Sequence, residues 1–113
     1  MSYVPKKGDI ISMEFDPQAG HEQKGRRPAL VISNGTFNKF TKFAMVCPIS
    51  NSDKGYVFHV KLDDKTKTKG VVLCDQARIL DITARKAQFV ETISGEILDK
   101  ITNMVISFIA DDK

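Results

Sequence analysis

The stretch Asp-Pro-Gln-Ala-Gly-His-Glu-Gln-Lys-Gly-Arg-Arg-Pro, residues 16–28, separates two apolar runs and decides how the chain folds. Before it, Ile11, Met13 and Phe15 alternate with polar residues, and this period of two predicts a half-buried strand over 10–15. After it, residues 29–32 are continuously apolar, which predicts a central strand covered on both faces. So long a connection in a small β-rich chain is typical of a functional or a disordered loop, and a solvated hairpin tip is the alternative.

The remaining pattern is one of short strands closed by one helix. Strands are expected over 43–49, 57–62 and 70–74, with a less regular one over 86–93 and a single helical turn over 36–40. Pro48 has no N–H to donate, so it indicates an edge or the end of pairing. Apolar residues keep helical spacing through 96–109, with Ser94 as the expected N-cap. About six strands and a C-terminal helix, without a βαβ rhythm, predict a mainly β fold with a strongly bent sheet or barrel.

Composition limits the possible functions only loosely. The chain has 113 residues, 42% hydrophobic and 27% charged, which predicts one domain over 1–113, and its formal charge of +3 is compatible with an anionic partner. Cys47 and Cys74 stand singly in apolar runs, so we expect buried, reduced thiols, and neither a metal site nor a cofactor. No signal pattern and no apolar run of roughly 20 residues is visible, and a cytoplasmic protein is therefore expected.

Residues 16–28 contain side chains that suit phosphate chemistry. His21 can pass protons near neutral pH, Glu22 can accept one, and the guanidiniums of Arg26 and Arg27 can grip phosphate in bidentate fashion. Further polar residues follow predicted strands, and strand ends converge on one rim in a small barrel. Those residues are Ser50, Asn51, Asp75, Gln76 and Arg78.

RNA carries its own nucleophile in the 2′-hydroxyl, so cutting it requires a proton acceptor, a proton donor and stabilisation of charge on the phosphate. Arg27 suits the phosphate clamp, whereas Glu22, Asp75 or His21 suits the base. Each residue also has a structural interpretation: Arg27 a surface salt bridge, Ser50 a turn cap, and Asp75 a partner of loop backbone. His59, in an alternating strand, is expected to be exposed and receives no role.

The run from Asp16 to Pro28 resembles the signature of the MazF/PemK family of toxins. The order of later elements resembles that family too, with Pro48-Ile49-Ser50, then Gly70-Val71-Val72-Leu73-Cys74-Asp75-Gln76-Ala77-Arg78, Ile82-Thr83-Ala84-Arg85 and a closing amphipathic helix. The likeness covers nearly the whole chain, and the His-Glu-Gln and Cys-Asp-Gln elements are similar to those of the plasmid Kid/PemK branch.

The resemblance implies an SH3-like β-barrel with a helix, in a homodimer. It implies the toxin of a type II toxin–antitoxin system: a metal-independent, sequence-selective endoribonuclease that cuts single-stranded mRNA and leaves 2′,3′-cyclic phosphate and 5′-hydroxyl ends. The implied partners are single-stranded RNA and a cognate antitoxin whose acidic, flexible tail occupies the RNA groove.

By the resemblance, the catalytic residues are Arg27, Ser50 and Glu22, with Ser50 at a position usually held by threonine. His21 and Asp75 match positions with catalytic or substrate-binding roles, and Leu73 stands where the Kid branch has an arginine. The residues expected to bind RNA are Gln23, Arg26, Asn51, Tyr56, Gln76 and Arg78. Two alternatives share the fold: a DNA-gyrase poison of the CcdB type, acting through its C-terminal helix, and a member that binds without catalysis.

Overall fold

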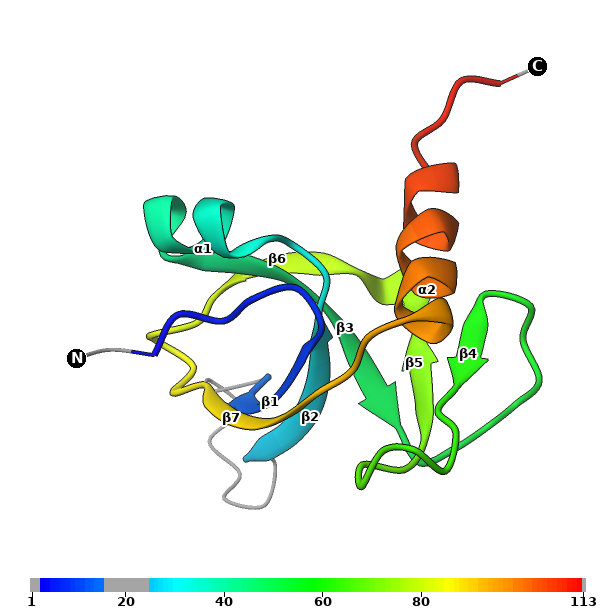
Figure 1. Ribbon diagram of the computed structural model, residues 1–113, viewed down its shortest axis with the longest axis horizontal. Helices are drawn as coiled ribbons and strands as arrows, with labels where there is room; N and C mark the ends of the chain where they lie inside the picture. Colours follow the sequence, from blue (N-terminus) through cyan, green and yellow to red (C-terminus); the bar gives the residue numbers. More distant parts are fainter. Residues whose placement is uncertain (1–2, 16–24, 113) are drawn as a thin grey trace.

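The computed structural model describes residues 3–15 and 25–112, and its elements are drawn in Figure 1. In chain order the described elements are β1 (Asp9–Glu14), β2 (Arg26–Val31), α1 (Gly35–Thr41), β3 (Phe43–Ser50), β4 (His59–Lys61), β5 (Val71–Leu73), the 3₁₀ turn η2 (Cys74–Gln76), β6 (Arg78–Asp81), β7 (Gln88–Thr92) and α2 (Glu96–Ser107). The mainly β class and the C-terminal helix are confirmed. The described residues contain a seventh strand, β6, and a second α-helix, α1.

All the described strand pairs are antiparallel, and they follow the order β4-β5-β3-β2-β1-β7, with β6 paired to β3 beside this path. Within the described ranges, β4 and β7 end the path and are not paired with each other. Figure 1 shows the strongly bent sheet that the sequence predicts. Because β4 and β7 are not paired within the described ranges, hydrogen bonds do not close this sheet into a barrel.

Strand β3 is the centre of the sheet because it changes partners along its length. Residues up to Val46 pair with β6, whereas Ile49 and Ser50 pair with β5. Pro48 lies between these two ladders and opposite Ala29 of β2. The residue without an N–H thus lies where the partner of β3 changes from β6 to β5. Pairing with β2 ends at Pro48, as the sequence predicts, whereas β3 itself continues beyond Pro48 and pairs with β5.

The two faces of the central strands are both buried. On one face Ile10, Leu30 and Cys47 pack under Leu98 and Ile101 of α2. On the other, Ile11, Ala29, Val31 and Val46 form a second cluster, against which Phe15 and Leu80 pack. The two-sided burial predicted for residues 29–32 is confirmed for Ala29, Leu30 and Val31, which are fully buried, while Ile32 is partly buried.

The helix ends differ in detail from the expected ones. Helix α2 ends at Ser107, and its N-cap is Gly95, not Ser94, with φ of 78°, a backbone conformation that favours glycine. Helix α1 is longer than the predicted turn because Asn34 caps it, accepting the Phe37 N–H at 2.8 Å. No helix in the described part of the chain is long and apolar enough to span a membrane.

Candidate active site

Strand register collects the candidate residues on one face of the sheet. Ala29 of β2 lies opposite Pro48 of β3, so Arg27, two residues before Ala29, and Ser50, two residues after Pro48, extend the same face and approach each other. Arg78 of β6 pairs with Val46, two residues before Pro48, and joins this face from the other side. The antiparallel register therefore brings together residues that are far apart in the sequence.

These side chains line a groove of about 410 Å³. Its described lining consists of Phe15, Arg27, Pro48, Ile49, Ser50, Leu73, Gln76 and Arg78. Two of them are arginines and none of these eight is acidic, so the described wall is electropositive. The Arg78 guanidinium lies 5.1 Å from the centre of the Phe15 ring, a cation–π distance that holds both side chains at the groove wall. Positive charge beside a ring suits a phosphate and its neighbouring base.

Ser50 is fixed by its own backbone environment. Its hydroxyl oxygen accepts the Ser52 N–H at 3.0 Å, so the turn-cap interpretation is correct, yet the hydroxyl proton remains available to donate. Gly70 passes so close to the Ser50 carbonyl that a Cβ at this position would collide with it. Absence of a side chain at Gly70 thus lets β5 approach and hold the end of β3.

The two neighbouring arginines have different surroundings. The Arg26 guanidinium donates to the Ser12 hydroxyl at 3.0 Å and to the Ser12 and Lys86 carbonyl oxygens, so it ties β1 and β2 to the start of β7. The Arg27 side chain lines the groove, and its guanidinium forms no hydrogen bond with another described residue, while its backbone pairs with Met13 of β1. Arg26 is therefore held away from the groove, although the sequence suggests similar roles for the pair.

The other predicted residues divide into three groups. Gln76 lines the groove beside Arg78, whereas Asn51 and Tyr56 are exposed and are not part of the lining. His21, Glu22 and Gln23 lie outside the described residues. Asp75 projects from η2, next to Gln76, and its side chain is 41% exposed.

His59 differs most from the expectation. Its side chain is only 7% exposed, with Nε2 3.2 Å from Asp75 Oδ1 and the Tyr56 ring centred 5.0 Å away. The expectation of an exposed histidine is wrong because the Tyr56 ring and the Asp75 carboxylate cover the imidazole, whereas Lys61, on the same face of β4, is exposed. Alternation alone carried no signal of this burial, since both faces of β4 have a neighbour.

Both cysteines are buried free thiols, as the sequence predicts. Burial raises the pKa of Cys47 to about 12, with additional contributions from Cys74 and Asp75. Burial, followed by the negative charge of Asp75, raises the pKa of Cys74 to about 11. The field of the Asp75 carboxylate thus reaches the core behind the groove.

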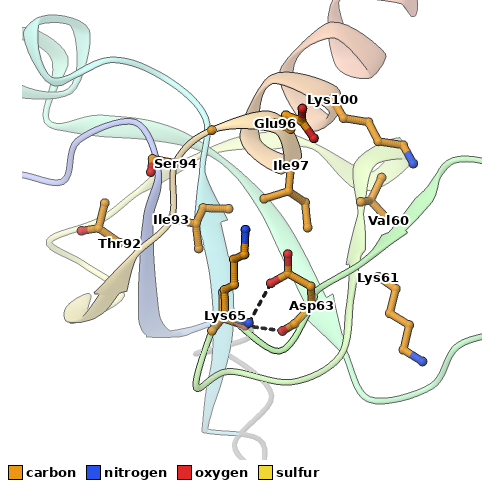
Figure 2. Close-up of a pocket in the computed structure, with 12 residues that line it drawn as sticks. Val60, Lys61, Asp63, Lys65, Thr92, Ile93, Ser94, Glu96, Ile97 and Lys100 are labelled. Atoms are coloured by element: carbon orange, nitrogen blue, oxygen red, sulfur yellow. Dashed lines mark hydrogen bonds between the residues drawn. The ribbon is translucent and has the colours of Figure 1, made fainter.

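A larger cavity, of about 590 Å³, lies between the turn after β4 and the start of α2 (Figure 2). Lys61, Lys65 and Lys100 share its lining with Asp63 and Glu96, so it has mixed charge, and none of the predicted site residues belongs to it. We therefore regard the smaller groove as the candidate active site. The described residues contain no group of three or more His, Cys, Asp or Glu side chains arranged to hold a metal ion.

Comparison with known proteins identifies the family of this chain. A family model described as PemK-like, MazF-like toxin of type II toxin-antitoxin system matches residues 6–109. Endoribonuclease toxin MazF of Escherichia coli K12 is 39% identical over 99 residues, 88% of each chain, and Endoribonuclease PemK of E. coli is 36% identical, covering 88% of this chain and 81% of the relative. The crystal structure of MazE-MazF (Form-II) from Deinococcus radiodurans superposes with a TM-score of 0.84 at 32% identity, covering 96% of this chain and 97% of that one. The chain therefore belongs to the PemK-like, MazF-like toxins of type II toxin–antitoxin systems.

Proposed function

We propose that this endoribonuclease cuts single-stranded mRNA at a short recurring sequence, without a metal ion, and leaves 2′,3′-cyclic phosphate and 5′-hydroxyl ends. The observation that carries the proposal is the meeting of Arg27, Ser50 and Arg78 in one groove with no acidic residue in its described wall. The proposal treats residues 1–113 as one toxin domain that acts in the cytoplasm, where mRNA is present.

The reaction needs only groups that the RNA and this chain supply. The 2′-oxygen attacks the adjacent phosphorus, a new P–O2′ bond forms, and the P–O5′ bond breaks. The proton acceptor takes one proton from the 2′-hydroxyl and Arg27 delivers one to the departing 5′-oxygen, so no water is consumed. Arg27 holds the phosphate and donates towards its oxygens, and the Ser50 hydroxyl adds a second donor as negative charge accumulates.

The proton acceptor is the remaining part of the proposal. We assign it to Glu22, with His21 and Asp75 as the other candidates; Glu22 and His21 lie outside the described residues. Arginine is unsuitable as the base because its pKa lies above about 12. Bound RNA would extend along Gln76 and Arg78, with a base against the partly buried Phe15 ring or the exposed Tyr56 ring. Gln23 and Asn51 are further proposed contacts, whereas Arg26 supports the strands beside the groove.

The proposed partners follow from the family and from one relative. The D. radiodurans MazF was crystallised with MazE, and we propose that this chain likewise binds a cognate antitoxin, whose acidic tail enters the electropositive groove. We also propose a homodimer, since α2 and β6 leave apolar side chains exposed that a second copy would cover. These include Ile79, Ile106 and Ile109.

Substitution of the phosphate clamp tests the assignment. We expect Arg27→Ala to lower kcat/KM for RNA cleavage by at least about 100-fold, because a charge-assisted donor to the transition state is lost. Its unfolding free energy should change by less than about 0.5 kcal/mol, as for an exposed side chain away from the core. Arg27→Lys is the matched control, because it keeps the charge but loses the bidentate geometry. Its kcat/KM should lie between those of the wild type and of Arg27→Ala. A well-folded Arg27→Ala protein that cuts like the wild type would remove Arg27 from the mechanism.

A second candidate function has one observation in its favour. The end of α2 exposes Ile106, Phe108 and Ile109, and a CcdB-type gyrase poison requires an exposed surface there. Inhibition of DNA supercoiling that is lost with Ile106→Ser and kept with Arg27→Ala would favour this alternative. The opposite pattern, with RNA cleavage lost in Arg27→Ala, would exclude it.

A further inference from the structure

His59 lies beside the groove, on the same face of the sheet as the groove-lining residue Leu73. It pairs with Leu73 of β5, and Leu73, like Ser50, belongs to the groove lining. Cross-strand partners in an antiparallel pair project to the same side, so the imidazole and the Leu73 side chain are neighbours. A polar, titratable side chain is thus placed next to the groove wall, where the mechanism described above gives it no task.

The imidazole is the fixed member of its pair with Asp75. Its backbone N–H donates to the Tyr56 carbonyl at 3.1 Å, the Cys74 N–H donates to the Phe58 carbonyl at 3.2 Å, and the tilted Tyr56 ring packs near it. At 7% exposure the side chain has little freedom, whereas the Asp75 carboxylate, at 41%, can still rotate. The histidine therefore restricts the aspartate, and not the reverse.

The polar atoms of His59 lack other partners. Nε2 approaches Asp75 Oδ1 to 3.2 Å, but among the described residues neither ring nitrogen forms a hydrogen bond of good geometry. An unpaired buried donor is unfavourable, and a small rotation of the carboxylate would satisfy it. The Asp75 carboxylate is the acceptor that lies beside Nε2, and Asp75 comes one residue before Gln76, which lines the groove.

We propose that His59 is a positioning residue: its Nε2–H holds the Asp75 carboxylate on η2, beside the groove lining, where that carboxylate accepts a hydrogen bond from bound RNA. The inference rests on the proposed function, since it concerns RNA in the same groove. It adds to that function a residue from β4, a strand that contributes none of the described groove-lining side chains.

A matched pair of substitutions separates positioning from packing. Glutamine places an amide N–H₂ near the position of histidine Nε2, whereas asparagine places it near Nδ1 and cannot reach Asp75. We expect His59→Asn to lower kcat/KM for RNA cleavage by about tenfold or more, as for the loss of a hydrogen bond to a charged group. His59→Gln should retain most of the activity, although both variants should unfold at similar temperatures.

The kinetic readout also identifies the partner. His59→Asn should change the same parameter, kcat or KM, as Asp75→Asn, and the double variant should be no worse than the more severe single one, because the two residues act as a unit. Equal activity of the Asn and Gln variants, additive effects, or an Asp75→Asn protein with wild-type kinetics would overturn the proposal. Wild-type protein that leaves RNA intact would instead overturn the proposed function, and the role of His59 with it.

Discussion

At the scale of single residues, the proposed chemistry depends on two donors, one on β2 and one on the neighbouring strand β3. Arg27 supplies charge and Ser50 a hydroxyl whose lone pair is already occupied by the Ser52 N–H. This internal hydrogen bond orients the Ser50 oxygen and leaves its proton for the phosphate. A serine at this position is therefore held by the turn that follows it, although it lacks the methyl group that would restrict its rotamers.

Substitutions at Ser50 follow from this arrangement. We expect Ser50→Ala to lower kcat for RNA cleavage by about 100-fold, as when one donor to a developing oxyanion is removed. Ser50→Thr should keep or raise kcat because it retains the hydroxyl and stiffens the side chain. Single-turnover cleavage of a short RNA would measure both. Wild-type rates for Ser50→Ala would show that the hydroxyl serves only the turn.

The residues that could be predicted at this scale are those whose neighbours in the sequence are distinctive. Arg27 precedes Pro28, Ser50 directly follows the predicted strand over 43–49, and Gln76 and Arg78 come soon after the one over 70–74, so their placement near strand ends could be inferred. His59 could not, because its burial depends on β5, a strand whose pairing with β4 is set by a long-range register. The sequence does indicate Asp75 as a candidate base, but it does not indicate that His59 lies beside that carboxylate.

At the scale of elements, period-two alternation located the strands but not their partners. The sequence pattern does not separate β6 from the polar residues of the preceding turn, η2. Only the pairing with β3 defines β6 as a strand of its own. The missing N–H of Pro48 predicts an edge or the end of pairing, and the ladder with β2 does end there. The sequence contains no local signal that β3 exchanges β6 for β5 at that residue.

The turn after β4 is held to β7 by one carboxylate. Glu91 accepts the Lys67 N–H at 3.1 Å, the Thr68 N–H at 2.7 Å and the Thr68 hydroxyl at 2.7 Å. Burial acts to raise the Glu91 pKa, but the hydrogen bonds from Thr68 and Lys67 together outweigh it, so the pKa is lowered from its ordinary value of 4.5. A carboxylate with a lowered pKa stabilises the fold above its ordinary pKa and loses that contribution as the pH falls through the folded value.

Acid should therefore release this turn. We expect the amide proton signals of Lys67 and Thr68 to lie downfield at pH 7 and to move upfield together below about pH 4.5. In Glu91→Gln, a nearly isosteric control without the charge, the pH-dependent movement should be absent. Signals that titrate identically in the two proteins would contradict the clamp.

At the scale of the whole molecule, one electropositive groove is proposed to serve both substrate and inhibitor. The fold forms it by bending a single sheet so that β1, β2, β3, β5 and β6 contribute to one wall. The class of fold could be predicted because strand and helix periodicities are strong. The lack of pairing between β4 and β7 could not be predicted, since closure of a barrel depends on contacts between strands far apart in the chain.

Competition follows from a shared groove. We expect an acidic peptide and a non-cleavable single-stranded RNA to weaken each other's binding, each raising the other's apparent Kd in proportion to its concentration. Fluorescence anisotropy with a labelled 2′-O-methyl RNA would measure this, with a peptide carrying Gln and Asn in place of Glu and Asp as the control. Simultaneous binding with unchanged affinities would mean that the two sites are separate.

The most direct test of the central claim is to incubate the purified protein with a long single-stranded RNA in excess EDTA and to map the new ends. We expect the wild-type protein, but not Arg27→Ala, to cut the RNA at one recurring short sequence and to leave 2′,3′-cyclic phosphate and 5′-hydroxyl termini. Intact RNA at high protein concentration, or cleavage that appears only when a divalent metal ion is restored, would contradict it.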